Sequence, residues 1–118
     1  MIKHENTLPV TLREHMRGGD GTVIIRDFAT KEELLGSARL CGAITLEPGC
    51  GIGVHGHNGE SELFFLQSGK AIYNDNGTEH EVSAGDVTVC RDGECHEKHV
   101  VWFPHYLYFA GYYLLMIV

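Results

Sequence analysis

The chain has 118 residues, a formal net charge of −7 at pH 7 and 15 glycines. This length predicts one domain with a core of its own, and we expect it to span residues 1–118. The negative charge, with no run rich in Lys or Arg, argues against nucleic-acid binding, because phosphate contacts require a basic surface. Charged residues from Lys3 onward, with no apolar run behind them, predict no signal peptide and a cytoplasmic protein.

Short runs of β-forming residues alternate with turn residues along most of the chain. They predict strands over 7–14, 22–28, 37–47, 60–67, 70–75, 78–83 and 87–90. Pro9 marks the first of these as an edge strand, because proline cannot donate to a sheet ladder. Strands of this length with a turn every eight to twelve residues are typical of an all-β sandwich or barrel.

The segments between the strands carry their own local signals. Residues 16–21 are rich in glycine and predict a loop, either a lid or a dimer contact. Thr30 and Glu33 have the spacing of a capping box and predict at most a turn or two of helix through Leu35. Asp75-Asn76-Gly77, between two strand-like runs, predicts a tight hairpin.

The four cysteines are Cys41, Cys50, Cys90 and Cys95, and none forms a Cys-x-x-Cys pair. A thiolate zinc site is therefore not expected. We expect reduced and mostly buried thiols, as is usual in a cytosolic protein.

Residues 49–69 contain the chemistry that stands out in this sequence. His55 and His57 lie two apart, which places them on one face of a strand, and Glu62 follows after the turn signal Asn58-Gly59. Two imidazoles and a carboxylate on adjoining strands can meet at one point, and such a set suits a divalent transition metal. His96 is a fourth candidate. Glu60 is an alternative carboxylate, because it shares the face of Glu62.

This stretch resembles the first signature of the cupins, which is Gly, five residues, His-x-His, three or four residues, Glu, six residues and Gly. The matching residues are Gly49, His55, His57, Glu62 and Gly69. The second cupin signature is matched at Gly85, Gly93 and His96, whereas Arg91 stands in place of its Pro and Val100 in place of its Asn. The first residues also look like those of short bacterial single-domain cupins. The resemblance covers roughly residues 1–98.

The resemblance implies a cupin double-stranded β-helix, the jelly-roll barrel, with its core over about 22–118 and a leader over 1–21. It also implies that His55, His57, Glu62 and His96 hold one metal ion inside the barrel, where Fe, Mn, Zn, Ni and Cu all suit the ligands. Four protein ligands leave two octahedral positions open for water, substrate or dioxygen. Tyr73 and Phe64 either line the cavity or pack in the core.

Two functions fit this chemistry. The first is a metal-dependent enzyme on a small molecule, dioxygenase-like or sugar-isomerase-like, although no catalytic acid or base can be named from the sequence. The second is a non-catalytic module that binds a small ligand in the same pocket. A homodimer is expected in both cases, because large apolar patches are rarely left exposed.

The last 19 residues, 100–118, carry no charged residue and hold seven aromatic side chains. Three structures are open for them. They can close the barrel with one strand through Trp102-Phe103 and another over 112–118, which would cover sheet edges. They can be a disturbed end that leaves the barrel incomplete and the site degenerate. They can form a membrane helix, which Pro104 and Gly111 argue against.

Overall fold

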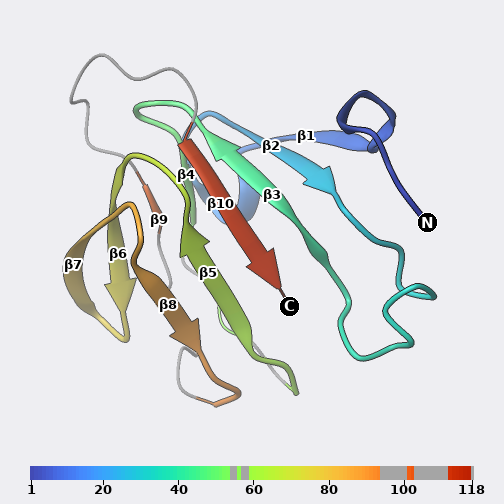
Figure 1. The fold of residues 1–118 in the computed structure, drawn as a ribbon. Helices are drawn as coiled ribbons and strands as arrows, with labels where there is room; N and C mark the ends of the chain where they lie inside the picture. Colours follow the sequence, from blue (N-terminus) through green and yellow to red (C-terminus); the bar gives the residue numbers. More distant parts are fainter. Residues whose placement is uncertain (54–55, 57–58, 94–100, 103–111, 118) are drawn as a thin grey trace.

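The structure is a computed structural model that describes residues 1–53, 56, 59–93, 101–102 and 112–117 (Figure 1). Within these residues lie two 3₁₀ helices, η1 (Glu5–Thr7) and η2 (Met16–Gly18). The strands are β1 (Val10–Glu14), β2 (Thr22–Asp27), β3 (Cys41–Leu46), β4 (Gly51–Ile52), β5 (Glu62–Leu66), β6 (Lys70–Asp75), β7 (Thr78–Ser83), β8 (Val87–Cys90), β9 (Val101–Trp102) and β10 (Tyr112–Ile117).

The strands form two antiparallel sheets. One has the order β1-β2-β3-β10-β5-β8 and the other the order β4-β9-β6-β7. Alternate side chains of both sheets form one buried cluster between them, as expected where two sheets pack face to face. Its members from the larger sheet are Val23, Ile25, Ile44, Leu46, Phe64 and Leu66, and those from the smaller sheet are Ile52, Ala71 and Tyr73. The predicted all-β fold is confirmed.

The predicted bounds of β6, β7 and β8 are confirmed residue by residue. β2 is one residue shorter than its predicted strand, β5 three and β3 five, because the flanking residues turn toward the next element. The first predicted strand begins only at Val10, since η1 occupies residues 5–7, and it lies at a sheet edge as Pro9 predicts.

The β6–β7 hairpin follows from its turn residues. Asp75 pairs with Thr78, which leaves Asn76 and Gly77 as a two-residue loop. Both have positive φ, 50° and 96°, which this kind of hairpin turn requires. The Asn74 side chain accepts a hydrogen bond of 2.8 Å from the Gly77 amide and fixes the turn further.

The apolar tail completes both sheets. β10 pairs with β3 on one side and with β5 on the other, so it is an inner strand of the larger sheet (Figure 1). β9 lies between β4 and β6 in the smaller sheet. The closing strands predicted near 102–103 and 112–118 are confirmed, and a membrane helix through 112–117 is wrong. Across the described part of the chain, the structure has no helix with the length and apolarity to cross a membrane.

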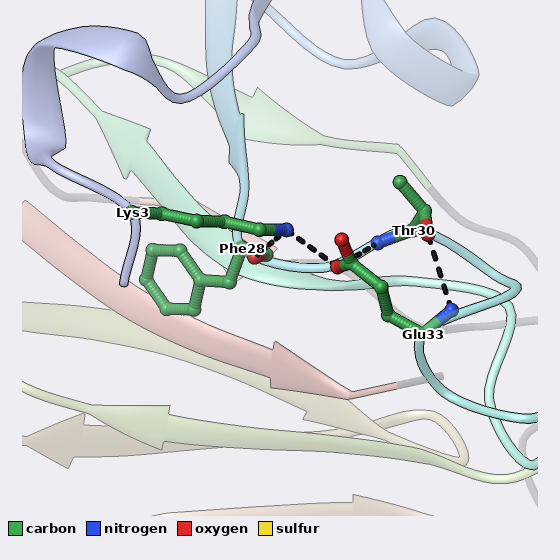
Figure 2. A network of polar contacts seen from close by, with 4 residues as sticks. All are labelled: Lys3, Phe28, Thr30 and Glu33. Atoms are coloured by element: carbon green, nitrogen blue, oxygen red, sulfur yellow. Dashed lines mark hydrogen bonds and ion pairs between the residues drawn. The ribbon is translucent and has the colours of Figure 1, made fainter. Parts of the chain in front are cut away.

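The N-terminal segment is attached to the β2–β3 connection by a small polar network (Figure 2). The Lys3 ammonium donates to the Phe28 carbonyl oxygen at 3.0 Å and also to the Glu33 carboxylate. Glu33 accepts from the Thr30 amide at 3.0 Å, and Thr30 Oγ1 accepts from the Glu33 amide at 3.1 Å. This is the predicted capping box, but residues 31–36 form hydrogen-bonded turns rather than a helix, because Leu35 and Gly36 both have positive φ.

The glycine-rich loop at 16–21 packs its backbone against β4. The Gly53 amide donates to the Met16 carbonyl at 2.9 Å, and the Gly51 amide donates to the Asp20 carbonyl at 2.8 Å. A Cβ on Gly53 would lie only 1.8 Å from the Arg17 carbonyl oxygen. The loop therefore supports the chain just before the His55 and His57 segment, which favours a structural role over a lid.

The cysteine prediction is wrong in part. Cys41 and Cys50 are free thiols, but they are half-buried rather than buried. Cys90 is fully buried and disulfide-bonded. The prediction of reduced thiols rested on the expected compartment, and compartment carries no information on which thiols the folded chain brings together. The homodimer stays a prediction, because the structure holds a single chain.

Replacing Gly53 with Ala should lower the free energy of unfolding by roughly 2 kcal/mol or more, because the new methyl group would overlap backbone atoms of the 16–21 loop. Gly36→Ala is the control. A Cβ there meets nothing within 4 Å, and only the positive φ of 71° should cost stability, about 1 kcal/mol. Chemical denaturation measures both, and equal losses would contradict the close approach at Gly53.

Candidate functional site

Glu62 places a carboxylate inside the barrel. It is the first residue of β5, where Glu62, Phe64 and Leu66 are buried and the two residues between them are more exposed. The period of two directs the Glu62 side chain toward the core, where its exposed fraction is 4%. Its partner in the adjacent strand is Cys90, the last residue of β8, so Glu62 lies at one end of the larger sheet.

Two further polar side chains face the same interior. Thr88 lies opposite Phe64 in the β5–β8 pair and has an exposed fraction of 8%. Tyr73 lies across the core on β6, in the smaller sheet. Burial raises the pKa of Tyr73 to about 12, an interaction with the Thr88 hydroxyl opposes this shift, and the negative charges of Asp75 and Glu62 add to it. The phenol therefore stays protonated at neutral pH and can donate a hydrogen bond.

The interior is unfavourable for a carboxylate unless cations or donors compensate it. Moving an ionised group out of water costs several kcal/mol per ion in proteins. A coordinated cation or a set of hydrogen bonds can offset a cost on the order of this size. Glu62 shares its interior with the apolar Phe64 and Leu66 as well as with Tyr73. A carboxylate in such surroundings suits a metal ligand, because a bound cation offsets its charge.

An ion pair lies at the rim of the same end of the barrel. Arg39 donates from Nε to Glu60 Oε2 at 3.1 Å and from Nη2 to Glu60 Oε1 at 2.9 Å. The pair forms because Cys41 and Leu63 both lie opposite Ile117 of β10, so the starts of β3 and β5 are one strand apart. The hydrogen bonds that Arg39 donates to Glu60 raise the pKa of Arg39, and the negative charge of Glu62 contributes in the same direction.

A second contact fixes the rim on the side of β8. The Gly59 amide donates to Asp92 Oδ1 at 2.8 Å and joins the segment before β5 to the turn after β8. With the Arg39–Glu60 pair, this contact holds both sides of the segment that leads into Glu62. The rim near Glu62 thus carries two acidic side chains, Glu60 and Asp92, and one guanidinium.

Of the four predicted metal ligands, the structure describes Glu62, and it faces the interior as predicted. His55, His57 and His96 lie outside the described residues. Among the residues that are described, no three His, Cys, Asp or Glu side chains gather as a metal site. The alternative ligand Glu60 pairs with Arg39 and its side chain is 30% exposed, which favours Glu62.

Sequence reasoning missed the rim contacts. Arg39 and Glu60 are 21 residues apart and Gly59 and Asp92 are 33 apart, so no local pattern joins them. The predicted strands 37–47 and 60–67 even included Arg39 and Glu60, whereas β3 begins at Cys41 and β5 at Glu62. Tyr73 and Phe64 were expected either to line the cavity or to pack in the core, and both belong to the buried cluster.

The chain is similar to known proteins over most of its length. It is 38% identical over 82 residues to an oxalate-binding protein of Thermotoga maritima, and the match covers 70% of this chain and 68% of that protein. Its fold matches the crystal structure of a predicted oxalate decarboxylase, also from Thermotoga maritima, with a TM-score of 0.87 and 27% identity. That match covers 99% of this chain and 96% of the other.

More distant structures share the fold alone. A cupin-like protein of Thermotoga maritima has a TM-score of 0.68 and 19% identity, over 84% of this chain and 69% of its own. A sugar phosphate isomerase of the cupin superfamily from Silicibacter pomeroyi has a TM-score of 0.63 and 19% identity, over 80% and 57%. The family described as the cupin domain matches residues 42–100. Together with the two facing sheets, these similarities show that the chain belongs to the cupin family.

Proposed function

We propose that this cupin binds one divalent transition metal ion in its barrel and uses it to hold a small carboxylate ligand such as oxalate. The buried carboxylate of Glu62 is the observation that carries the proposal. His55, His57 and His96 are the proposed partners of Glu62, and imidazole with carboxylate suits Fe, Mn, Zn, Ni and Cu. The name of the similar Thermotoga protein supports oxalate as the first ligand to test.

Charge explains why the ligand and the metal belong together. Oxalate is a dianion at neutral pH, and Glu62 already contributes one negative charge to the interior. For like charges at close range in a poorly solvated site, Coulomb's law with a low effective dielectric gives a repulsion on the order of several kcal/mol. A divalent cation would offset these charges, and when bound it would act as a Lewis acid on a carboxylate oxygen.

The chain supplies a neutral donor to the same interior. The high pKa of Tyr73, about 12, keeps the phenol protonated across the physiological range. A protonated phenol can donate a hydrogen bond, and a carboxylate oxygen of the ligand is a suitable acceptor. We assign Tyr73 the role of orienting the ligand from the side of the smaller sheet.

A second candidate function is turnover of the ligand. Loss of carbon dioxide from oxalate leaves formate, and this requires a proton to be delivered to carbon. Tyr73 is a protonated group near Glu62 that could deliver it, and a similar solved structure is described as a predicted oxalate decarboxylase. The dioxygenase-like and sugar-isomerase-like activities expected from the sequence have no comparable support, because the similarity to sugar phosphate isomerases shows the fold alone.

Elemental analysis of the purified and reconstituted protein should find about one transition metal ion per chain, the stoichiometry of a single mixed imidazole and carboxylate site. Glu62→Gln and His57→Ala should each lower the metal affinity about tenfold or more, because each removes a ligand. Glu60→Gln is the matched control, a glutamate two residues away that pairs with Arg39, and it should retain the metal. Metal loss in Glu60→Gln with retention in Glu62→Gln would exchange the two assignments.

Titration calorimetry should show that oxalate binds the metal-loaded protein and not the metal-free protein. Tyr73→Phe should keep the metal and weaken oxalate binding roughly tenfold, the size of one hydrogen bond to a charged acceptor. Equal oxalate affinity with and without metal would contradict the proposed site. Unchanged affinity in Tyr73→Phe would remove that residue from it.

Turnover is tested on the same samples. If the chain is a decarboxylase, incubation of the metal-loaded protein with oxalate should release carbon dioxide and formate in equal amounts, and Tyr73→Phe should slow this release more than it weakens binding. Binding without either product would assign the chain to the non-catalytic function.

A further inference from the structure

The Arg39–Glu60 pair lies at the end of the barrel where Glu62 faces inward, and neither partner belongs to the proposed metal ligands. The Arg39 side chain is 55% exposed and the Glu60 side chain is 30% exposed. Glu60 engages Nε and Nη2 of Arg39, which uses two of the five N–H groups of the guanidinium. The group is thus held in one orientation while it remains accessible from solvent.

We propose that Arg39 is a specificity residue that binds the second carboxylate of a dicarboxylate ligand whose first carboxylate lies at the metal. This inference rests on the proposed function. A guanidinium presents a planar fork of N–H groups that matches the two oxygens of a carboxylate, which a lysine or an amide cannot reproduce. A small ligand with a single carboxylate would leave Arg39 unused, so the residue favours dicarboxylates over monocarboxylates.

The charges around the rim support this role. Glu60, Glu62 and Asp92 place three carboxylates at this end of the barrel, in a chain whose formal net charge is −7. Arg39 supplies a positive charge among them, and the influence of Glu62 on its pKa indicates that the guanidinium lies within electrostatic range of the interior carboxylate. Arg39 thus offsets part of the negative charge that an anionic ligand would meet at this end of the barrel.

If the Arg39–Glu60 pair only stabilised the fold, removing either residue would have a different effect on ligand binding. Half-exposed ion pairs contribute little to stability, so the pair stabilises the segment before β5 only weakly. Under the recognition role, the Glu60 carboxylate competes with the anionic ligand for the N–H groups of Arg39 and repels it. The two residues should therefore affect binding in opposite directions, whereas a purely structural pair would make both losses alike.

The test compares the metal-loaded parent with Arg39→Gln and Glu60→Gln in titration calorimetry against oxalate and formate. Metal content and melting temperature are measured for each protein. Arg39→Gln should weaken oxalate binding about tenfold or more and change formate binding less than about twofold, because formate has no second carboxylate. Glu60→Gln should leave oxalate binding as tight as in the parent or tighter.

Three results would overturn the inference. Unchanged oxalate affinity in Arg39→Gln would overturn it alone and leave the proposed function standing. Equal weakening in both variants, with parallel losses of melting temperature or metal, would show that the pair has only a structural role. No oxalate binding by the metal-loaded parent would overturn the proposed function and the inference with it.

Discussion

A glutamate held among apolar side chains imposes the constraint on which the rest of this site depends. Glu62 is buried by the same strand alternation that buries Phe64 and Leu66, so the sheet cannot form in this register without bringing the carboxylate inside. An interior carboxylate requires positive charge or donors around it. The protonated Tyr73 across the core, the guanidinium at the rim and the proposed metal ion each meet part of that requirement.

The fold creates the site by joining distant segments at one end of the larger sheet. β10 is inserted between β3 and β5, so the tail of the chain sets the spacing that lets Arg39 reach Glu60. The 16–21 loop supports β4 through backbone hydrogen bonds at Gly51 and Gly53, just before the His55 and His57 segment. A tail without charged residues is therefore consistent with a paired inner strand rather than with a disturbed end.

The features that could be predicted from the sequence are those that depend on residues close together in the chain. Alternation and turn residues predicted β6, β7 and β8 with their bounds, and the signature spacing singled out Glu62. The capping box at Thr30 formed as predicted, yet the positive φ of Leu35 stopped a helix. The Arg39–Glu60 pair and the disulfide at Cys90 depend on which segments the fold brings together, and spacing along the chain does not encode that directly.

The most direct test of this account is a crystal structure of the metal-loaded protein with oxalate, with anomalous diffraction at the absorption edge of the metal. One anomalous peak is expected inside the barrel, bonded to the Glu62 carboxylate and to imidazole nitrogens, with oxalate on the ion. A peak only on the outer face, for example at the exposed His80 between Glu79 and Glu81, would contradict it. In that case the buried carboxylate of Glu62 would have to be balanced by protein groups alone.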